Sequence, residues 1–364
     1  MPLFLFLTSL IAALFLIILL IPYAKKISLV DRPNQRKQHK DLTPLIGGLA
    51  IYLAMLVTLL VNDIQLLHQK EFIVAATLLV CVGVIDDYKE LSVKTRIIAQ
   101  IIAGLIMAEF AEIKITELGD IFGAGSIKLG EFSTVFTVLA VVGGINAFNM
   151  IDGIDGLAGT LTLVAITSIA IVSKLSQNWP IYYFCLILMA SIIAFLLFNL
   201  RIAGRKSASI FLGDTGSTLL GFSVCWLAIC ASQGENRIMP PVTVLWLTAV
   251  PFFDSISVMY RRIKNGRSPC SPDREHLHHY LATLGYGVNQ KLIILVSIAA
   301  IFSIVSLFTS LVLVVPEQIL FFTFLGLFAG YYWYINNAWK AVKVTEIQMQ
   351  YPEIQIRKTE DLSN

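Results

Sequence analysis

Eleven apolar runs constrain the fold of this 364-residue chain more than any other feature of its sequence. A run of about 20 apolar residues can cross a bilayer as a helix, and the backbone groups of a helix are paired within the segment, as a lipid environment requires. Only 14% of the residues are charged, whereas soluble domains contain about a quarter. We therefore predict an all-α polytopic membrane protein with about eleven spans, at residues 2–22, 45–61, 72–85, 97–111, 132–150, 157–173, 180–198, 216–232, 241–260, 292–315 and 318–335.

The 27 Lys and Arg residues are distributed unevenly between the two alternating sets of loops. One set contains only Lys70, Lys114, Lys128, Lys174 and Arg237. Because Lys and Arg concentrate in cytoplasmic loops, we expect the N-terminus outside, the C-terminus inside and residues 336–364 as a cytoplasmic polar tail. Glycine and β-branched residues favour a small periplasmic β-hairpin near 112–131. The first run lacks a basic start and a small-residue cleavage site, which favours a retained span over a signal peptide.

Most polar motifs fall in the predicted inner loops, at 23–44, 86–96, 149–156, 199–216 and 261–291. The outer loops are short and contain few such motifs. This asymmetry predicts a single site, built from several loops on the cytoplasmic face of one transmembrane catalytic domain, 1–335. The five cysteines include no C-x-x-C pair, so they indicate neither a zinc ribbon nor a disulfide framework.

Asp86 and Asp87 end the third apolar run. Adjacent carboxylates repel one another unless a cation or a proton intervenes, and a divalent ion with oxygen ligands such as Mg²⁺ would meet that need. The alternative is a solvated helix end, with Asp87 paired to Lys89 or Lys94.

The stretch NMIDGIDG places Asn149, Asp152 and Asp155 three residues apart. This spacing puts the three side chains on one face of a helix, but Gly153 and Gly156 favour a loop that a ligand can approach closely. The alternate-position pattern of a calcium-binding loop is absent. A plain polar turn between two spans is the alternative.

Asp214 lies between two glycines in FLGDTGS, at the start of an apolar run. An aspartic protease would need a second such aspartate in a β-rich lobe, and a P-loop would end in Gly-Lys-Ser/Thr. A metal ligand and an ordinary helix N-cap both fit the position.

The stretch SPDREHLHH predicts a helix that is capped by Ser271 and begins at Pro272. Its histidines are suited to zinc or to a diphosphate and a sugar, with Arg274 as a fork-shaped anion donor. Asp254, inside an apolar run, is a candidate functional acid by its location alone, and the sequence assigns it no role.

The ordered set DD, N-x-x-D-G-x-D-G-L-A, F-L-G-D-T-G-S and H-x-H-H closely resembles the polyprenyl-phosphate N-acetylhexosamine-1-phosphate transferases. The resemblance covers nearly the whole chain and implies transfer of a sugar 1-phosphate from a UDP-sugar to undecaprenyl phosphate at the bacterial inner membrane, with release of UMP. It also implies Mg²⁺ as the cofactor, with Mn²⁺ as a substitute, and a homodimer; nothing in it implies a nucleic-acid partner.

The histidine loop is similar to that of the WecA-type branch, which uses UDP-N-acetylglucosamine (UDP-GlcNAc) to initiate O-antigen or enterobacterial common antigen. The same chemistry with UDP-MurNAc-pentapeptide or in a teichoic-acid branch remains an alternative. An intramembrane prenyltransferase is another, although its usual motif is N-D-x-x-D-x-x-x-D. A transporter would place charges near mid-membrane, often in repeated halves, and the sequence has neither feature.

By resemblance, Asp86 binds or deprotonates the lipid phosphate, and Asp87 and Lys94 supply supporting charges. Asp214 is the main Mg²⁺ ligand and Asn149 assists it. Asp152 and Asp155 are catalytic-loop acids, with Asp155 and the backbone of Gly153 and Ile154 recognising uracil. The remaining substrate contacts implied are Phe211, Arg274, His276, His278 and His279, with Arg36, Lys37, His39 and Lys40 as an electrostatic funnel. Glu90 stands where some relatives have a third aspartate, and we assign it no catalytic role.

Overall fold

The structure is a computed structural model that describes residues 1–31, 42–62, 64, 66–202, 204–269, 271 and 275–350, with residues 343–350 described by their backbone alone. The basic residues 36, 37, 39 and 40 of the predicted funnel and Arg274 lie outside these ranges. The helices are α1 (Pro2–Lys26), α2 (Gly47–Asn62), α3 (Gln69–Lys89), α4 (Val93–Leu105), η1 (Ile106–Phe110), η2 (Gly130–Phe132), α5 (Ser133–Ile151), α6 (Leu157–Leu175), α7 (Trp179–Asn199), α8 (Gly213–Ser232), α9 (Pro241–Leu247), α10 (Ala249–Lys264), α11 (Leu277–Thr283), α12 (Val288–Leu307), η3 (Phe308–Val312) and α13 (Glu317–Gln350).

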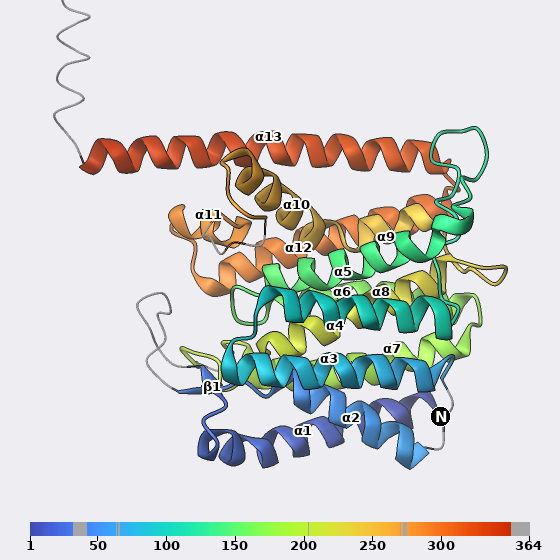
Figure 1. The fold of residues 1–364 in the computed structure, drawn as a ribbon, viewed down its shortest axis with the longest axis horizontal. Helices are drawn as coiled ribbons and strands as arrows, with labels where there is room; N and C mark the ends of the chain where they lie inside the picture. Colours follow the sequence, from blue (N-terminus) through green and yellow to red (C-terminus); the bar gives the residue numbers. More distant parts are fainter. Residues whose placement is uncertain are drawn as a thin grey trace, which may run out of the picture.

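Each predicted apolar run falls on one helix or on two consecutive helices, most of which lie roughly side by side (Figure 1). Within the described residues, seven helical segments are long and apolar enough to cross a membrane, and α9 with α10, bent by 76° at Thr248, makes an eighth. The prediction of an all-α polytopic membrane protein is therefore confirmed. Helix α2 has only 16 residues, and α3 and α4 are not among the seven, so the number eleven stays a prediction.

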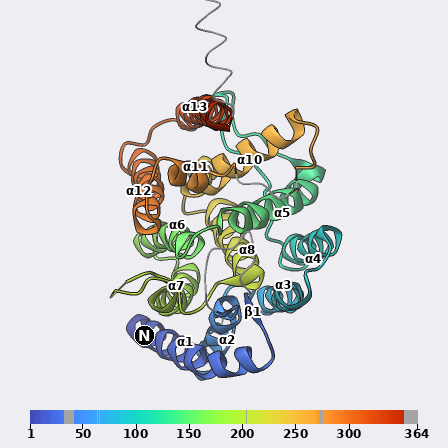
Figure 2. The ribbon, with the colours of Figure 1, turned by 90° about the vertical axis from the view of Figure 1, so that its left-hand side faces the viewer.

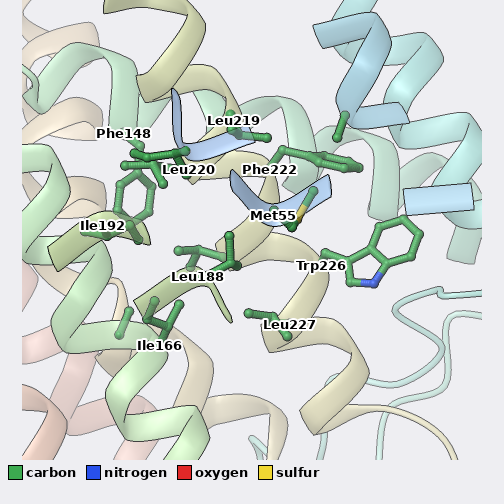
Figure 3. Close-up of a cluster of buried hydrophobic side chains, with 14 of the residues drawn as sticks. Met55, Phe148, Ile166, Leu188, Ile192, Leu219, Leu220, Phe222, Trp226 and Leu227 are labelled. Carbon is green, nitrogen blue, oxygen red and sulfur yellow. The ribbon is translucent and has the colours of Figure 1, made fainter. Parts of the chain in front are cut away.

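Helix α8 lies at the centre of the bundle, between α2, α3, α5, α6 and α7 (Figure 2). Its apolar side chains Leu219, Leu220, Phe222, Trp226 and Leu227 are almost completely buried, and they pack with residues of its neighbours, including Phe148 of α5 and Leu188 of α7 (Figure 3). Burying one such side chain stabilises a fold by about 1.5–3 kcal/mol in water, but in a bilayer close packing is the main contribution. The start of α8 is therefore held rigidly, and that start contains Asp214.

The connections alternate between the two ends of the bundle. Strands β1 (Val30–Asp31) and β2 (Thr43–Pro44) pair antiparallel, Val30 opposite Pro44, at the end where α3 and α5 finish and α8 begins (Figure 1). At the other end, residues 112–131 form an antiparallel bridge between Glu117 and Lys128, so the predicted hairpin is present as a single bridge and not as two strands. Helix α13 continues through the first part of the predicted tail.

Candidate active site

A cavity of about 1540 Å³ opens at the end of the bundle that contains β1, β2 and α11. It is lined by most of the site residues predicted from sequence, namely Asp86, Asp87, Asn149, Asp152, Gly153, Asp155, Phe211, Asp214, His278 and His279. The predicted inner loops thus converge on one place, although the chain positions of these residues span almost 200 residues.

Asp87 is bonded to the N-terminus of α8. One carboxylate oxygen accepts the backbone N–H of Asp214 at 2.7 Å, and the other accepts the backbone N–H and the hydroxyl of Thr215 at 3.2 and 2.6 Å. A helix N-terminus has unpaired N–H groups and a partial positive charge, so α8 holds this carboxyl group in place without a basic side chain. Burial outweighs these hydrogen bonds and, with the charge of Asp214, raises the pKa of Asp87 to about 7. Gly213 makes the approach possible because its φ is +75° and a Cβ there would collide with Asp87. Neither Lys89 nor Lys94 is its partner in the structure.

Asp86 is almost fully buried and both of its oxygens are engaged. Oδ1 accepts the N–H of Leu91 at 2.6 Å, and Oδ2 lies 3.2 Å from the Arg96 guanidinium. Arg96 also lies 3.9 Å from Asp214. Lys94, predicted to support these acids, is exposed and does not line the cavity, so Arg96 is the cation that the structure brings to the pair.

Asp214 faces the cavity from the first turn of α8. Its side chain is 41% exposed, and its Oδ1 accepts a hydrogen bond of 2.6 Å from the amide of Asn149 on α5. The same amide donates to Ser217 at 2.9 Å. Because Asp87 occupies the helix N-terminus, the Asp214 carboxylate is not needed as a cap and remains accessible from the cavity.

Helix α5 ends at Ile151, so Asp152 and Asp155 lie in the loop before α6. The Asp152 carboxylate makes no hydrogen bond or ion pair with any described residue. Burial, together with the negative charges of Asp214, Asp155 and Asp87, raises the pKa of Asp152 to about 8. An acid in this state is stabilised as an anion only when a cation approaches it.

Asp155 does have a cation beside it. The Arg201 Nε lies 2.6 Å from Asp155 Oδ2, and the two residues join the 152–156 loop to the end of α7. Asn199 strengthens this junction because its side chain accepts the N–H of Gly156 at 2.6 Å and donates to the carbonyl of Ile210 at 2.8 Å. Gly156 itself has φ +83°, which favours glycine.

The histidine loop is anchored by Asp254 of α10, which is 1% exposed. Asp254 Oδ2 lies 2.7 Å from His276 Nδ1, and Oδ1 accepts the N–H of Leu277 at 2.8 Å and the hydroxyl of Tyr331 at 3.3 Å. The carboxylate therefore favours the His276 tautomer that carries its proton on Nδ1. Asp254 also satisfies the start of α11, which begins at Leu277; the helix start predicted at Pro272 lies outside the described residues.

His278 and His279 line the cavity, whereas His276 is turned towards Asp254. His278 is 2% exposed, and neither of its ring nitrogens has a partner in the described part of the chain. Burial and the neighbouring His279 lower the pKa of His278 to about 3, so it is neutral at pH 7 and offers one donor and one acceptor. A Cβ on residue 153 would collide with the His278 ring, so the packing of this ring against the loop requires glycine at this position.

Phe211 precedes α8 and is held by backbone bonds. Its N–H donates to the carbonyl of Pro44 at 2.8 Å, and its carbonyl accepts from Gly47 at 3.0 Å. These bonds connect the β1–β2 pair to the cavity, and they fix the backbone from which the Phe211 ring lines the wall.

The cavity also contains residues that the sequence did not single out. Lys291 and Lys206 line it, as does Arg201. Arg96 and Arg201 stood among the basic residues that indicated orientation, but no local motif marked them as site residues. Their partners lie 10 and 46 residues away in the chain. For Arg96 the sequence offered one signal: Asp86 ends an apolar run, and Arg96 follows within the first two turns of the next helix.

No group of three or more His, Cys, Asp or Glu side chains in the described residues is arranged to hold a metal ion. Mg²⁺ does not require such a group, because it usually binds through one or two carboxylates together with water and substrate phosphates. Asp152, Asp214 and Asn149 line the same cavity, and their carboxylate and side-chain carbonyl oxygens are ligands of the type that Mg²⁺ prefers.

Comparison with known proteins agrees with this arrangement. Residues 71–232, from α3 to the end of α8, match the model of glycosyl transferase family 4. The chain is 36% identical over 320 residues to the undecaprenyl-phosphate alpha-N-acetylglucosaminyl 1-phosphate transferase of Escherichia coli strain K12, covering 88% of this chain and 87% of that protein. It is 37% identical to the transferase of the same name from Yersinia pestis, over 88% and 87% of the two chains, and 37% identical to that of Pasteurella multocida, over 88% and 90%.

Proposed function

The chain belongs to glycosyl transferase family 4, and from that membership we propose that it transfers GlcNAc-1-phosphate from UDP-GlcNAc to undecaprenyl phosphate and releases UMP. The family predicted from the four motifs is thus confirmed. The proposed lipid acceptor and the transferred group are those in the names of the three relatives, and UDP as the carrier is what the resemblance of the motifs implies. The observation that best supports the proposal is the cavity itself, which brings all four motifs together at one end of a membrane bundle.

The cavity has acids and cations on different elements, as this reaction needs. Among the acids, Asp86 lies on α3, Asp152 in the loop after α5, and Asp214 on α8. Among the cations, Arg201 and Lys206 lie between α7 and α8, and Lys291 lies on α12. Phosphoryl transfer depends mainly on positioning and on neutralising charge. We propose that the acid side holds Mg²⁺ through Asp214, Asp152 and Asn149, and that the cationic side holds the donor.

When bound, Mg²⁺ would neutralise the donor diphosphate and make its phosphorus more electrophilic. The reaction forms a bond from an oxygen of the lipid phosphate to the GlcNAc-bearing phosphorus and breaks the bond from that phosphorus to the oxygen that leaves with UMP. The attacking oxygen is already anionic near neutral pH, so the chain need not remove a proton from it.

Direct attack by the lipid phosphate fits the acids better than a covalent enzyme intermediate. Asp87 accepts three hydrogen bonds at the start of α8, and both oxygens of Asp86 are engaged with Leu91 and Arg96. A carboxylate bonded in this way is a weak nucleophile. We propose that Asp87 fixes the position of Asp214; the role of Asp86 at the lipid phosphate stays a prediction.

We propose that His278 and His279, which line the cavity, contact the sugar and diphosphate, with His278 acting as a neutral hydrogen-bonding group. Asp155, predicted to bind uracil, has one carboxylate oxygen paired with Arg201. We propose that Arg201 orients this carboxylate and that the second oxygen binds the base. A role for Arg274 stays a prediction, as does the homodimer.

The uneven distribution of Lys and Arg supports a cytoplasmic position for the cavity, with eleven spans in a bacterial inner membrane. The cavity end contains the ends of α1, α3 and α10, each with basic residues in its last turn. UDP-sugars are cytoplasmic, so this orientation places the donor and the cavity on the same side. The product would be the first lipid-linked sugar of a cell-surface polysaccharide such as O-antigen or enterobacterial common antigen.

The test is UMP release by purified protein in detergent with undecaprenyl phosphate and Mg²⁺, using UDP-GlcNAc and UDP-MurNAc-pentapeptide in parallel. We expect UMP from UDP-GlcNAc alone, loss of activity in EDTA, and recovery on adding Mg²⁺. Asp214→Ala should lower the rate at least about 100-fold, the effect of one main electrostatic contact, whereas Glu235→Ala, an exposed acid at the other end of the bundle, should not. UMP from neither donor, with folded protein, would refute the proposal.

A further inference from the structure

Lys291 is a buried cation that the cavity residues leave unbalanced. It lies in the first turn of α12 and lines the cavity, yet it is only 8% exposed. Its ammonium group makes no hydrogen bond or ion pair within the described chain. The ammonium nitrogen is not among the fully buried atoms, so it keeps contact with the cavity. A lysine this buried is nevertheless rare without a partner, because withdrawing most of its surroundings from water is unfavourable.

The surroundings of Lys291 also disfavour a positive charge. Arg201 is close enough to repel it electrostatically, and the carboxylate nearest Arg201, that of Asp155, is already paired with the guanidinium. The first turn of a helix carries a partial positive charge of its own. The fold therefore does not stabilise this ammonium, and a lysine at this position is better explained by an anion that arrives with a ligand.

The position of Lys291 indicates which ligand this is. The start of α12 is tied to the end of α7 by a hydrogen bond of 3.1 Å from the Asn289 side chain to the carbonyl of Arg201. Leu292, the next residue, approaches Gly156 of the 152–156 loop. Lys291 thus lies beside the loop proposed to bind the nucleotide, and on a different element from Asp86, for which a contact with the lipid phosphate is predicted.

We propose that Lys291 binds the diphosphate of the nucleotide-sugar donor, as the cation that completes a phosphate subsite with Arg201. This inference rests on the proposed function, because it takes its ligand from there. A lysine acts on phosphate as a point charge, and the donor phosphates would supply the negative charge that the described residues around Lys291 lack.

The proposal predicts opposite effects on stability and on binding. Lys291→Met keeps most of the side-chain length and removes the charge. Without donor its melting temperature should equal or exceed that of the wild type, because an unbalanced buried charge is gone. Its affinity for UDP-GlcNAc and for UDP, measured by isothermal titration calorimetry in detergent with Mg²⁺, should fall at least about tenfold, as expected for a lost charge-assisted hydrogen bond.

Two further variants make the result specific. Lys291→Arg should recover most of the UDP affinity, and Lys264→Met, an exposed lysine at the same end that does not line the cavity, should bind UDP like the wild type. In the UMP-release assay, Lys291→Met should raise KM for UDP-GlcNAc and leave KM for undecaprenyl phosphate within about twofold.

The inference is overturned if Lys291→Met binds UDP within about twofold of the wild type, if it loses affinity and melting temperature together, or if the lipid KM changes in place of the donor KM. These outcomes are separate from failure of the proposed function. If the wild type binds UDP but releases no UMP from UDP-GlcNAc, the function is wrong, whereas the UDP affinities of the variants still decide the role of Lys291.

Discussion

Replacing Asp254 with alanine tests whether an acid inside a membrane helix positions the histidine loop. Asp254 receives two short hydrogen bonds, from His276 at 2.7 Å and Leu277 at 2.8 Å, and a longer one from Tyr331 at 3.3 Å. A hydrogen bond to a charged group contributes about 1.5–3 kcal/mol, so losing the two short bonds removes about 3 kcal/mol or more from the ordered loop. At about 1.4 kcal/mol per factor of ten, this corresponds to about a 100-fold fall in the population of the ordered loop.

Donor affinity should decrease with that population, because a site that is ordered only part of the time binds in proportion to its ordered fraction. We expect UDP-GlcNAc affinity, measured by isothermal titration calorimetry, to fall up to about 100-fold in Asp254→Ala. Asp254→Asn keeps one acceptor oxygen and should lose about tenfold. Tyr331→Phe, which removes only the longest of the three bonds, should stay within about threefold.

His276→Ala provides an independent check because it removes one of the short bonds from the other side. It should reproduce part of the loss and add little to Asp254→Ala, since two residues that act through one bond are not additive. Asp254→Ala with near-normal donor affinity would refute the positioning role. So would an affinity loss that merely follows a general fall in melting temperature, with His276→Ala and Asp254→Ala fully additive.

Two further predictions concern the acid side of the cavity. Gly213→Ala should lower the melting temperature and UMP release more than Gly204→Ala does. Both glycines have a positive φ, +75° and +80°, so alanine at either position adds backbone strain of about 1 kcal/mol or more. Only a Cβ at Gly213 would also collide with Asp87. Equal effects of the two substitutions would argue against a collision between residue 213 and Asp87. In EDTA, thermal stability should fall as pH rises from about 4 through 8, because the folded protein holds the Asp152 proton up to a pKa of about 8, well above its ordinary 3.8. Asp152→Asn should flatten the dependence of melting temperature on pH. An unchanged slope in this variant would contradict the assignment of that dependence to Asp152.

The sequence predicted what depends on local patterns. The apolar runs identified the helices because hydrophobicity over about 20 residues is a strong signal. The convergence of Asp86, Asn149, Asp155 and Asp214 followed from alternating topology alone, since every second loop returns to the same end. The pairs that hold these acids depend on helix phase and packing, which no motif records. Arg96, and not Lys94, reaches Asp86 because α4 begins at its Ser92 cap and Arg96 is thereby turned towards α3.

The same limit applies to residues whose meaning comes from what surrounds them. Lys291 was one basic residue among the many that indicated orientation, and only its burial without a partner makes it notable. Asp254 stood out as an intramembrane acid, but its role could not be stated until α10 was seen to pack beside the start of α11. The start of α11 at Leu277 could not be located from sequence for the same reason, because the acid that satisfies its first turn is supplied by another helix.

The charges of the cavity explain why the metal and the donor should bind together. Three of its acids have a partner within the fold: Asp87 is bonded to a helix N-terminus, and Asp86 and Asp155 each lie beside an arginine. Among the residues that the structure describes, Asp152 and Asp214 have no cation or helix N-terminus as a full partner, and on the other side Lys291 has no partner. A cation alone would add to the repulsion on Lys291, and an anionic donor alone would add to the repulsion on Asp152. Each ligand therefore removes the charge that opposes the other, and we expect Mg²⁺ to raise donor affinity by the same factor as the donor raises Mg²⁺ affinity.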